Sequence, residues 1–504
     1  MKRLSLIILS IMLIAAILCV AVACDDNSGT QNIDNGTNQS GTNTDDSGGN
    51  DKDDGTGGEV VTPPEGGDDE TEEGGEVTPT SDGVFTYALN ADGETYTVRG
   101  AIDKNSSEYA IPAIFGGKPV TAIESEAFRR SDYLVAVSIP ATVTDIGERA
   151  FSLCRDLETV TFEEGSELNA IGARAFFECE SLDNVKLPAG LKYVGAGAFE
   201  GCYSLMDLTV PASVERIGKD AFECAYTDSV ATSGIVYFGK VAYKYVNIYD
   251  EGQSAPAVDA VIKEGTVAIA DSAFEGMTEL ISVTVPASVT HIGADAFTST
   301  GLASITVDKA NTVYYSESNA ILTYNTATLV KGTASTVIPD SVAAIADNAF
   351  KGVTGLVNIV IPVRVTTIGA CAFENCASLE TVTLNSAVTV IPDGAFRNCT
   401  ALKEIKIEKP VKEIAGTAFS GCTALKTVWI DSPDVIIACN MSLEAGHLLE
   451  AAETVYVSDR AFVIEGEDGE ESEDPRKQEA AYLVAFFDKG ASSDGYTVWT
   501  RKAA

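Results

Sequence analysis

Residues 198–218 read AFEGCYSLMDLTVPASVERIG, and this stretch decides the fold because its pattern recurs along most of the chain. Its Ala-Phe pair returns at eleven phenylalanines: Phe128, Phe151, Phe176, Phe199, Phe222, Phe274, Phe297, Phe350, Phe373, Phe396 and Phe419. The gaps between them are 23, 25, 23, 23, 52, 23, 53, 23, 23 and 23 residues. A fixed period in this range predicts a solenoid, in which each repeat forms one coil that stacks on the next.

Each repeat has the same internal pattern. After Phe199, the apolar Leu208 and Val210 alternate with polar residues, as in a short strand with one buried face. Pro211 then ends the strand, because proline cannot donate a hydrogen bond to a ladder. The Ile-Gly pair at residues 217–218 predicts a turn before the next buried Ala-Phe pair. A single repeat cannot bury its apolar face, so the repeats must stack.

Two gaps are about twice the period, and both contain strand-like runs. Residues 235–238 read Ile-Val-Tyr-Phe, and residues 320–322 read Ala-Ile-Leu. We expect β-hairpins over residues 231–262 and 308–337. These hairpins should keep the stack in register, because both segments rejoin the pattern, at Ile269 and Ile345.

The complete pattern, Ala-Phe-x-x-Cys-x-x-Leu-x-x-Val-x-Ile-Pro-x-x-Val-x-x-Ile-Gly, resembles the bacterial BspA-type leucine-rich repeat. The opening residues 111–123 also resemble the first unit of such arrays. The resemblance covers residues 83–430 and implies a β-rich, right-handed leucine-rich repeat solenoid with a parallel sheet on its concave side. It further implies a cell-surface protein that binds host or neighbouring-cell proteins. Residues 431–504 depart from the period, and we expect them to form a C-terminal cap over the exposed core.

The N-terminus predicts export. Three residues, Met1-Lys2-Arg3, precede an apolar run from Leu4 to Ala23, which is the layout of a secretory signal peptide over residues 1–23. The run ends in Ala21-Val22-Ala23-Cys24, which resembles the bacterial lipobox and implies lipidation of Cys24. We therefore expect a lipid-anchored protein of the bacterial cell envelope, on the cell surface. A retained apolar anchor and free secretion remain as alternatives, and both also leave the chain outside the cytoplasm.

Residues 24–82 are expected to form a disordered acidic tether. Residues 25–82 contain 17 Asp and Glu against one Lys, and no aromatic residue. Such a segment buries too little apolar surface to offset the entropy of ordering. The whole chain has a formal net charge of −40, which repels nucleic-acid phosphates and anionic lipid headgroups. We expect no nucleic-acid partner, and contact with the membrane only through the lipid anchor.

The cysteines give a second column. Of the 11 cysteines, Cys19 falls in the signal peptide and Cys24 in the lipobox, which leaves nine. Six of these stand three residues after a repeat phenylalanine: Cys154, Cys179, Cys202, Cys376, Cys399 and Cys422. Stacking should align them, and their apolar neighbours favour buried free thiols. Disulfides are the alternative, because secretion favours them.

The sequence contains no recognisable catalytic, metal or cofactor motif. There are only two histidines, His291 and His447, and no G-x-S-x-G, H-E-x-x-H, P-loop or Rossmann pattern. We therefore expect no enzyme activity, no metal and no cofactor. Two alternatives to a binding module stay open. One is a passive envelope or spacer protein, and the other is a cryptic carbohydrate-active enzyme that uses carboxylates alone.

A ligand face is expected where strand side chains point outward. Ten residues after a phenylalanine stand Ser138, Thr161, Lys186, Thr209, Thr284, Val360, Thr383, Lys406 and Trp429. Most are small and neutral, but basic and aromatic residues gather toward the C-terminal end. The candidate ligand face is Lys186, Lys403, Lys406, Lys426 and Trp429, for an unidentified extracellular protein or glycoprotein. The alternative is a solvated strand end with Trp429 packed under the cap.

Overall fold

The computed structural model describes residues 80–205, 208–223, 233–248, 255–384, 387–432, 436–437, 452–458, 487–493 and 496–501. The predicted signal peptide, Cys24, most of the predicted tether and most of the predicted cap lie outside these residues. Within the described ranges the regular structure is entirely β-strand. No helix there is long and apolar enough to cross a membrane.

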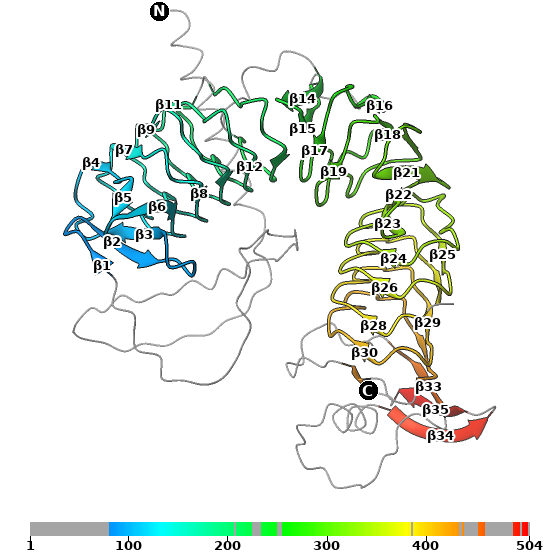
Figure 1. Ribbon diagram of the computed structural model, residues 1–504. Coiled ribbons are helices and arrows are strands. Elements are labelled where there is room, and N and C mark those ends of the chain that lie inside the picture. The colour runs from blue at the N-terminus through cyan, green and yellow to red at the C-terminus, as the bar shows by residue number, and fades with distance from the viewer. Residues whose placement is uncertain are drawn as a thin grey trace, which may run out of the picture. The chain divides into compact units, whose positions relative to one another are not determined.

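Each coil carries two strands, which belong to two different faces of the solenoid (Figure 1). In one coil these are β7 (Ala136–Ile139) and β8 (Asp145–Ile146). The next coil places β9 parallel to β7, with Val160 beside Val137, and β10 parallel to β8. We call the two surfaces the long-strand face and the short-strand face. The predicted solenoid with a parallel sheet is confirmed, and parallel sheets form on two faces rather than on one.

The remaining strands extend these two faces. On the long-strand face lie β4 (Glu108–Ala110), β9 (Thr159–Phe162), β11 (Asn184–Val185), β16 (Val258–Val261), β18 (Leu280–Val285), β20 (Ser304–Val307), β25 (Asn358–Ile361), β27 (Thr381–Leu384), β29 (Glu404–Ile407), β31 (Thr427–Ile430) and β33 (Thr454–Ser458). On the short-strand face lie β6 (Lys118–Ile123), β10 (Ala170–Ile171), β12 (Tyr193–Val194), β13 (Arg216–Ile217), β17 (Ala268–Ile269), β19 (His291–Ile292), β24 (Ala344–Ile345), β26 (Thr367–Ile368), β28 (Val390–Ile391), β30 (Glu413–Ile414) and β32 (Ile436–Ile437).

Antiparallel strands occur at the two ends and at the two insertions. At the N-terminal end, β1 (Thr80–Ser81), β2 (Phe85–Leu89) and β3 (Tyr96–Ala101) pair in order, and β5 (Ile114–Phe115) pairs with β6. At the C-terminal end, β35 (Tyr496–Arg501) joins β33 to β34 (Phe487–Ser493).

The two predicted hairpins are confirmed. In the first insertion β14 (Gly234–Phe238) pairs with β15 (Val241–Val246), and β15 then pairs in parallel with β17. In the second, β21 (Tyr314–Glu317), β22 (Ala320–Thr323) and β23 (Thr328–Lys331) form an antiparallel set that rejoins the stack at β24. Each insertion therefore supplies an extra strand to the short-strand face.

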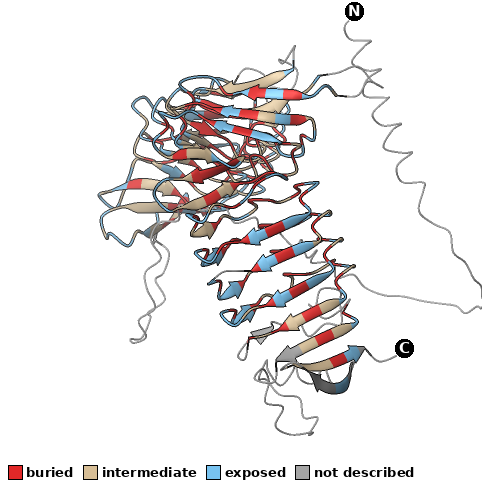
Figure 2. Ribbon diagram, turned by 90° about the vertical axis from the view of Figure 1, so that its right-hand side faces the viewer, coloured by how far each residue is buried: buried red, intermediate tan, exposed pale blue. Residues whose placement is uncertain are grey.

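The repeat phenylalanines form the core as stacked rings. The ring centroids of Phe128, Phe151 and Phe176 are 5.0 and 5.3 Å apart, with planes within 2° of parallel. Each ring is almost completely buried. The backbone follows the same ladder, since the Phe151 N–H donates to the carbonyl oxygen of Ala175 in the next coil at 2.7 Å. Along the strands, buried and exposed residues alternate as the sequence predicts, most plainly from β25 to β29 (Figure 2).

The glycines of the Ile-Gly pairs are required for close packing between coils. A turn does follow them, because Ala150 N–H donates to Gly147 O at 3.3 Å. However, a Cβ added at Gly147 would lie 2.5 Å from the backbone nitrogen of Ser125 in the preceding coil. The left-handed residues stand elsewhere, two positions on either side of the phenylalanine, as at Arg149 (φ 53°) and Leu153 (φ 64°). The glycine therefore sets coil separation rather than backbone handedness.

Candidate ligand-binding face

The outward residues of the long-strand face form one continuous row over its C-terminal coils. Strand register places Val360 beside Thr383, Lys406 beside Trp429, and Trp429 beside Tyr456. Their neighbours in sequence, such as Ile359 and Ile405, point inward and are buried. We call this line of side chains the outer row.

Three of the candidate lysines gather here, but each pairs with a carboxylate. Lys403 lies 2.7 Å from Glu380, Lys426 lies 2.5 Å from Glu453, and Lys406 lies 2.9 Å from Asp431. The hydrogen bond with Asp431 raises the pKa of Lys406 above its ordinary value. Exposed pairs of this kind contribute only about 0–1 kcal/mol to stability, but they neutralise the patch. The cluster therefore does not present the free positive charge that its lysines suggest.

Lys186 lies apart from the other four candidates. It is exposed and directly follows β11, which belongs to the sheet of β4, β7 and β9 near the N-terminal end. The other four belong to the sheet that runs from β25 to β34. The structure therefore joins Lys403, Lys406, Lys426 and Trp429 in one surface and leaves Lys186 outside it.

Trp429 packs against the C-terminal strands. Its ring stacks on Tyr456 with centroids 3.7 Å apart and planes within 8°, and Tyr496 meets it edge-on at 5.2 Å. The Tyr496 hydroxyl donates a hydrogen bond to Asp431, which also pairs with Lys406. This aromatic cluster (Trp429, Tyr456 and Tyr496) is half-buried. One face of the indole is covered, so a ligand could reach only the parts of the ring that stay outside the stack.

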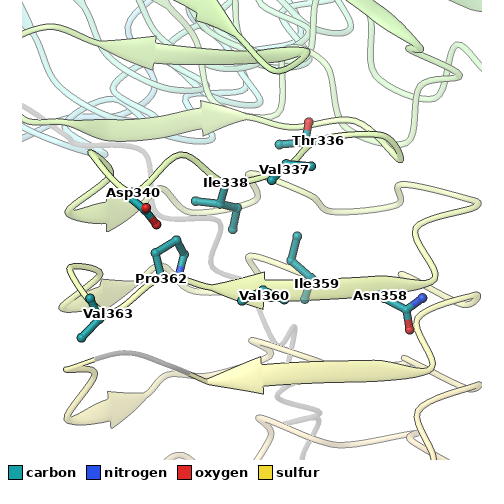
Figure 3. Close-up of a pocket in the computed structure, with 9 residues that line it drawn as sticks. All are labelled: Thr336, Val337, Ile338, Asp340, Asn358, Ile359, Val360, Pro362 and Val363. Atoms are coloured by element: carbon teal, nitrogen blue, oxygen red, sulfur yellow. The ribbon is translucent and has the colours of Figure 1, made fainter.

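An exposed apolar patch lies at the other end of the outer row. Val337, Val360 and Val363 are 72%, 52% and 70% exposed, and we call them the valine patch. They border a shallow pocket of about 500 Å³ (Figure 3), whose other lining residues are Thr336, Ile338, Asp340, Asn358, Ile359 and Pro362. The buried Ile338 and Ile359 form its apolar base. Contiguous exposed apolar residues are typical of interaction surfaces.

Sequence reasoning placed Val360 in the outer row but missed the patch. The available signal was a valine before each Ile-Pro pair, at Val337 before 338–339 and Val360 before 361–362. Val337 lies in the second insertion, where the regular period does not apply. Its position beside Val360 therefore depended on how the insertion rejoins the stack.

The six column cysteines are all buried, and each thiol contacts the preceding coil. The Sγ atom of Cys154 donates to the carbonyl oxygen of Phe128 at 3.1 Å, and that of Cys399 donates to Phe373 O at 3.2 Å. The same contact recurs at Cys179, Cys202, Cys376 and Cys422. Burial raises the pKa of Cys154, Cys376 and Cys422 to about 12, so these groups stay protonated donors. The prediction of buried thiols is confirmed for the described residues Cys154, Cys179, Cys376, Cys399 and Cys422.

These thiols should resist alkylation in the folded protein. At pH 8, iodoacetamide is expected to modify the half-buried Cys371 first and to leave Cys376, Cys399 and Cys422 intact until the protein is denatured. Peptide mapping by mass spectrometry measures this order. Equal alkylation rates at Cys371 and Cys399 in the native state would contradict the buried thiol column.

The cysteines do not assemble a metal site. Cys371 lies 3.6 Å from the Arg397 guanidinium, whereas the thiol of Cys376 is directed to Phe350 O. Among the residues placed in the structure, no group of three or more His, Cys, Asp or Glu side chains is arranged to hold a metal ion.

Parallel coils, a phenylalanine core and an outward strand row define a leucine-rich repeat solenoid. The model of the BspA type leucine rich repeat region matches residues 111–249, 254–331 and 330–438, with six copies. The chain therefore belongs to the BspA-type leucine-rich repeat family.

Several solved structures are similar to this chain. A leucine rich cell surface protein from Faecalibacterium prausnitzii is 27% identical, with 71% of this chain and 89% of that chain covered and a TM-score of 0.39. The pneumococcal vaccine antigen PcpA is 20% identical, with 77% and 88% covered and a TM-score of 0.37. A leucine-rich repeat protein from Eubacterium ventriosum is 16% identical, with 80% and 99% covered and a TM-score of 0.29. No curated protein matches the chain.

Proposed function

We propose that this protein is a cell-surface binding module that recognises an extracellular protein or glycoprotein through the outer row of its C-terminal coils. The observation that carries the proposal is the outer row itself. It exposes the valine patch at one end and the aromatic cluster at the other, on a single sheet.

The pocket beside the valine patch is suited to binding rather than to catalysis. Its lining residues include one carboxylate, Asp340, and no histidine or cysteine. Glycoside hydrolysis ordinarily requires two carboxylates that flank the scissile bond. An apolar side chain of a partner could instead fill the space between Val337, Val360 and Val363. Apolar and aromatic anchors of this kind commonly supply most of the energy of an interface.

Export and anchoring form the second part of the proposal. The apolar run of residues 4–23 and the lipobox-like Cys24 support a lipid-anchored protein of the bacterial cell envelope. The acidic composition of residues 25–82 supports a tether that holds the solenoid away from the membrane. Presentation at the cell surface would place the outer row within reach of extracellular partners.

The proposal is tested by saturable binding of the full-length protein to purified mucin and extracellular-matrix proteins. Val360→Asp combined with Val363→Asp should raise the dissociation rate at least about tenfold, which corresponds to about 1.4 kcal/mol. Trp429→Ala should also speed dissociation, because it removes an aromatic anchor. The matched control is Thr161→Asp, which adds the same charge at an outward position of β9 and should leave binding unchanged.

Two results would contradict the proposal. Absence of saturable binding to any of these partners would favour a passive spacer. An equal loss of binding in Thr161→Asp would mean that added negative charge acts without regard to position. Circular dichroism of every variant should match the wild type, because the substituted valines are exposed.

A further inference from the structure

The phenylalanine column is interrupted at the second insertion. Gly332 N–H donates to Ala349 O at 3.0 Å, as Phe350 N–H donates to Ala372 O at 2.7 Å in the next coil. Gly332 therefore occupies the place of a repeat phenylalanine, and Lys331 occupies the place of its alanine. A Cβ at Gly332 would lie 2.1 Å from the Phe350 ring, so that ring fills the space. The ring stack that ends at Phe297 does not continue directly to Phe350.

The apolar core divides at the same point. Alternate side chains of β22 face opposite sides of the strand. Ile321 belongs to the core of the preceding coils, whereas Ala320 and Leu322 belong to the core of the following coils. The two cores thus meet across one strand of the insertion rather than through a shared column of rings.

The junction also buries an amine. Lys331 is 4% exposed, and its Nζ has no hydrogen-bond partner among the residues that the structure describes. Nearby hydroxyls are satisfied elsewhere, since Thr336 Oγ1 donates to Asn319 O at 2.9 Å and also accepts from Thr333 N–H at 2.8 Å. The titratable groups that face Lys331 are Asp295 from the coil before the insertion and Cys376 from a coil after it. Asp295 is itself engaged by the Thr298 hydroxyl at 2.8 Å.

We propose that the second insertion is a built-in opening point of the solenoid. The coils before β21 and the coils after β23 form two cooperative blocks, and the unpaired amine of Lys331 weakens their contact. In a stack held by nearest-neighbour interfaces, one weak interface lets the blocks respond separately to stress. Every other described junction within the runs Phe128–Phe222 and Phe350–Phe419 has stacked rings instead.

The charge state of Lys331 sets how weak this contact is. Burial lowers the pKa of Lys331 to about 8 from its ordinary value of 10.5. Below pH 8 the amine is protonated in both the closed and open junction, and the full cost of burying the charge is present. As pH rises from about 8 to 10.5, the closed state loses its proton first, so closure becomes more favourable. The difference corresponds to a factor on the order of one hundred in the opening equilibrium.

The two tryptophans make the proposal testable, because Trp429 and Trp499 both lie in the C-terminal block. Urea unfolding of the full chain at pH 7 should give a fluorescence transition for that block alone and a far-ultraviolet circular dichroism transition for both blocks. In the wild type the two curves should not coincide. In Lys331→Met, which keeps the length of the side chain without its charge, the curves should converge. The gap between wild type and Lys331→Met should shrink as pH rises from 8 to 10.5.

The matched control is Lys309→Met, which removes an exposed lysine from the start of the same insertion. This variant should unfold like the wild type. Coincident fluorescence and circular dichroism curves in the wild type at pH 7 would overturn the two-block proposal. An equal shift in Lys309→Met would overturn the role of Lys331.

Discussion

Replacing Phe199 with alanine is expected to lower the free energy of unfolding by about 3–5 kcal/mol, the usual cost of removing a buried phenylalanine ring. Phe199 is completely buried and stacks between Phe176 and Phe222, with centroids 5.1 and 5.6 Å away. Its removal leaves a cavity between two rings that cannot close without shifting whole coils. Because each coil contacts mainly its neighbours, the loss should be greatest near residue 199 and fade along the stack.

Hydrogen exchange measures this local effect. Amides of the coils around β12 and β13 should lose protection first, while those from β25 to β31 should stay close to the wild type. The control is Tyr203→Ala in the same coil, where an aromatic ring that is 65% exposed is removed and little change is expected. A uniform rise in exchange from residue 83 to 430 would contradict nearest-neighbour stacking.

Replacing Gly195 with alanine should destabilise the protein by about 3 kcal/mol, although it adds only one methyl group. That carbon would lie 2.4 Å from the backbone nitrogen of Ala173 and 2.6 Å from the carbonyl carbon of Gly172, both in the preceding coil. Backbone atoms cannot rotate away as the end of a side chain can. The two coils must therefore separate, which weakens the hydrogen bond from Gly195 N–H to Ile171 O.

Gly190→Ala is the matched control for this substitution. Gly190 belongs to the same coil and has ordinary backbone geometry, and the nearest atom to an added Cβ is 3.8 Å away. Its replacement should be neutral or slightly stabilising, because alanine restricts the unfolded chain. Thermal unfolding of the two variants compares them directly. Similar melting temperatures for Gly195→Ala and Gly190→Ala would show that close approach between coils does not require the glycine.

Part of the candidate site was within reach of the sequence. The period of 23 residues places Glu380 directly beside Lys403, so their ion pair follows from the repeat once register is considered. The same reasoning brings Trp429 next to Lys406. The stack of Trp429 on Tyr456 could not be derived in this way, because Tyr456 lies 27 residues further on, outside the regular spacing.

The sequence by itself determined the repeating architecture. Eleven Ala-Phe pairs, the alternation before each Ile-Pro and the column of cysteines each follow from a period that leaves one way to bury the apolar residues. The family, the stacked phenylalanine core and the presence of two hairpins were therefore predictable. The Ile-Gly pairs were also visible, but the pattern alone did not reveal that each glycine allows close contact with the coil before it.

Only the tertiary structure decided what happens at the second insertion. Ile338 follows Gly332 by six residues, whereas Ile361 follows Phe350 by eleven, so this coil is shorter and its register cannot be read from the period. That shortening brings Val337 beside Val360 to form the valine patch, and it places Lys331 in a position that alanine fills elsewhere. Both results depend on contacts between segments that share no repeat pattern. Local sequence carries no information on such contacts, because they are set by how the insertion packs against the coils on either side.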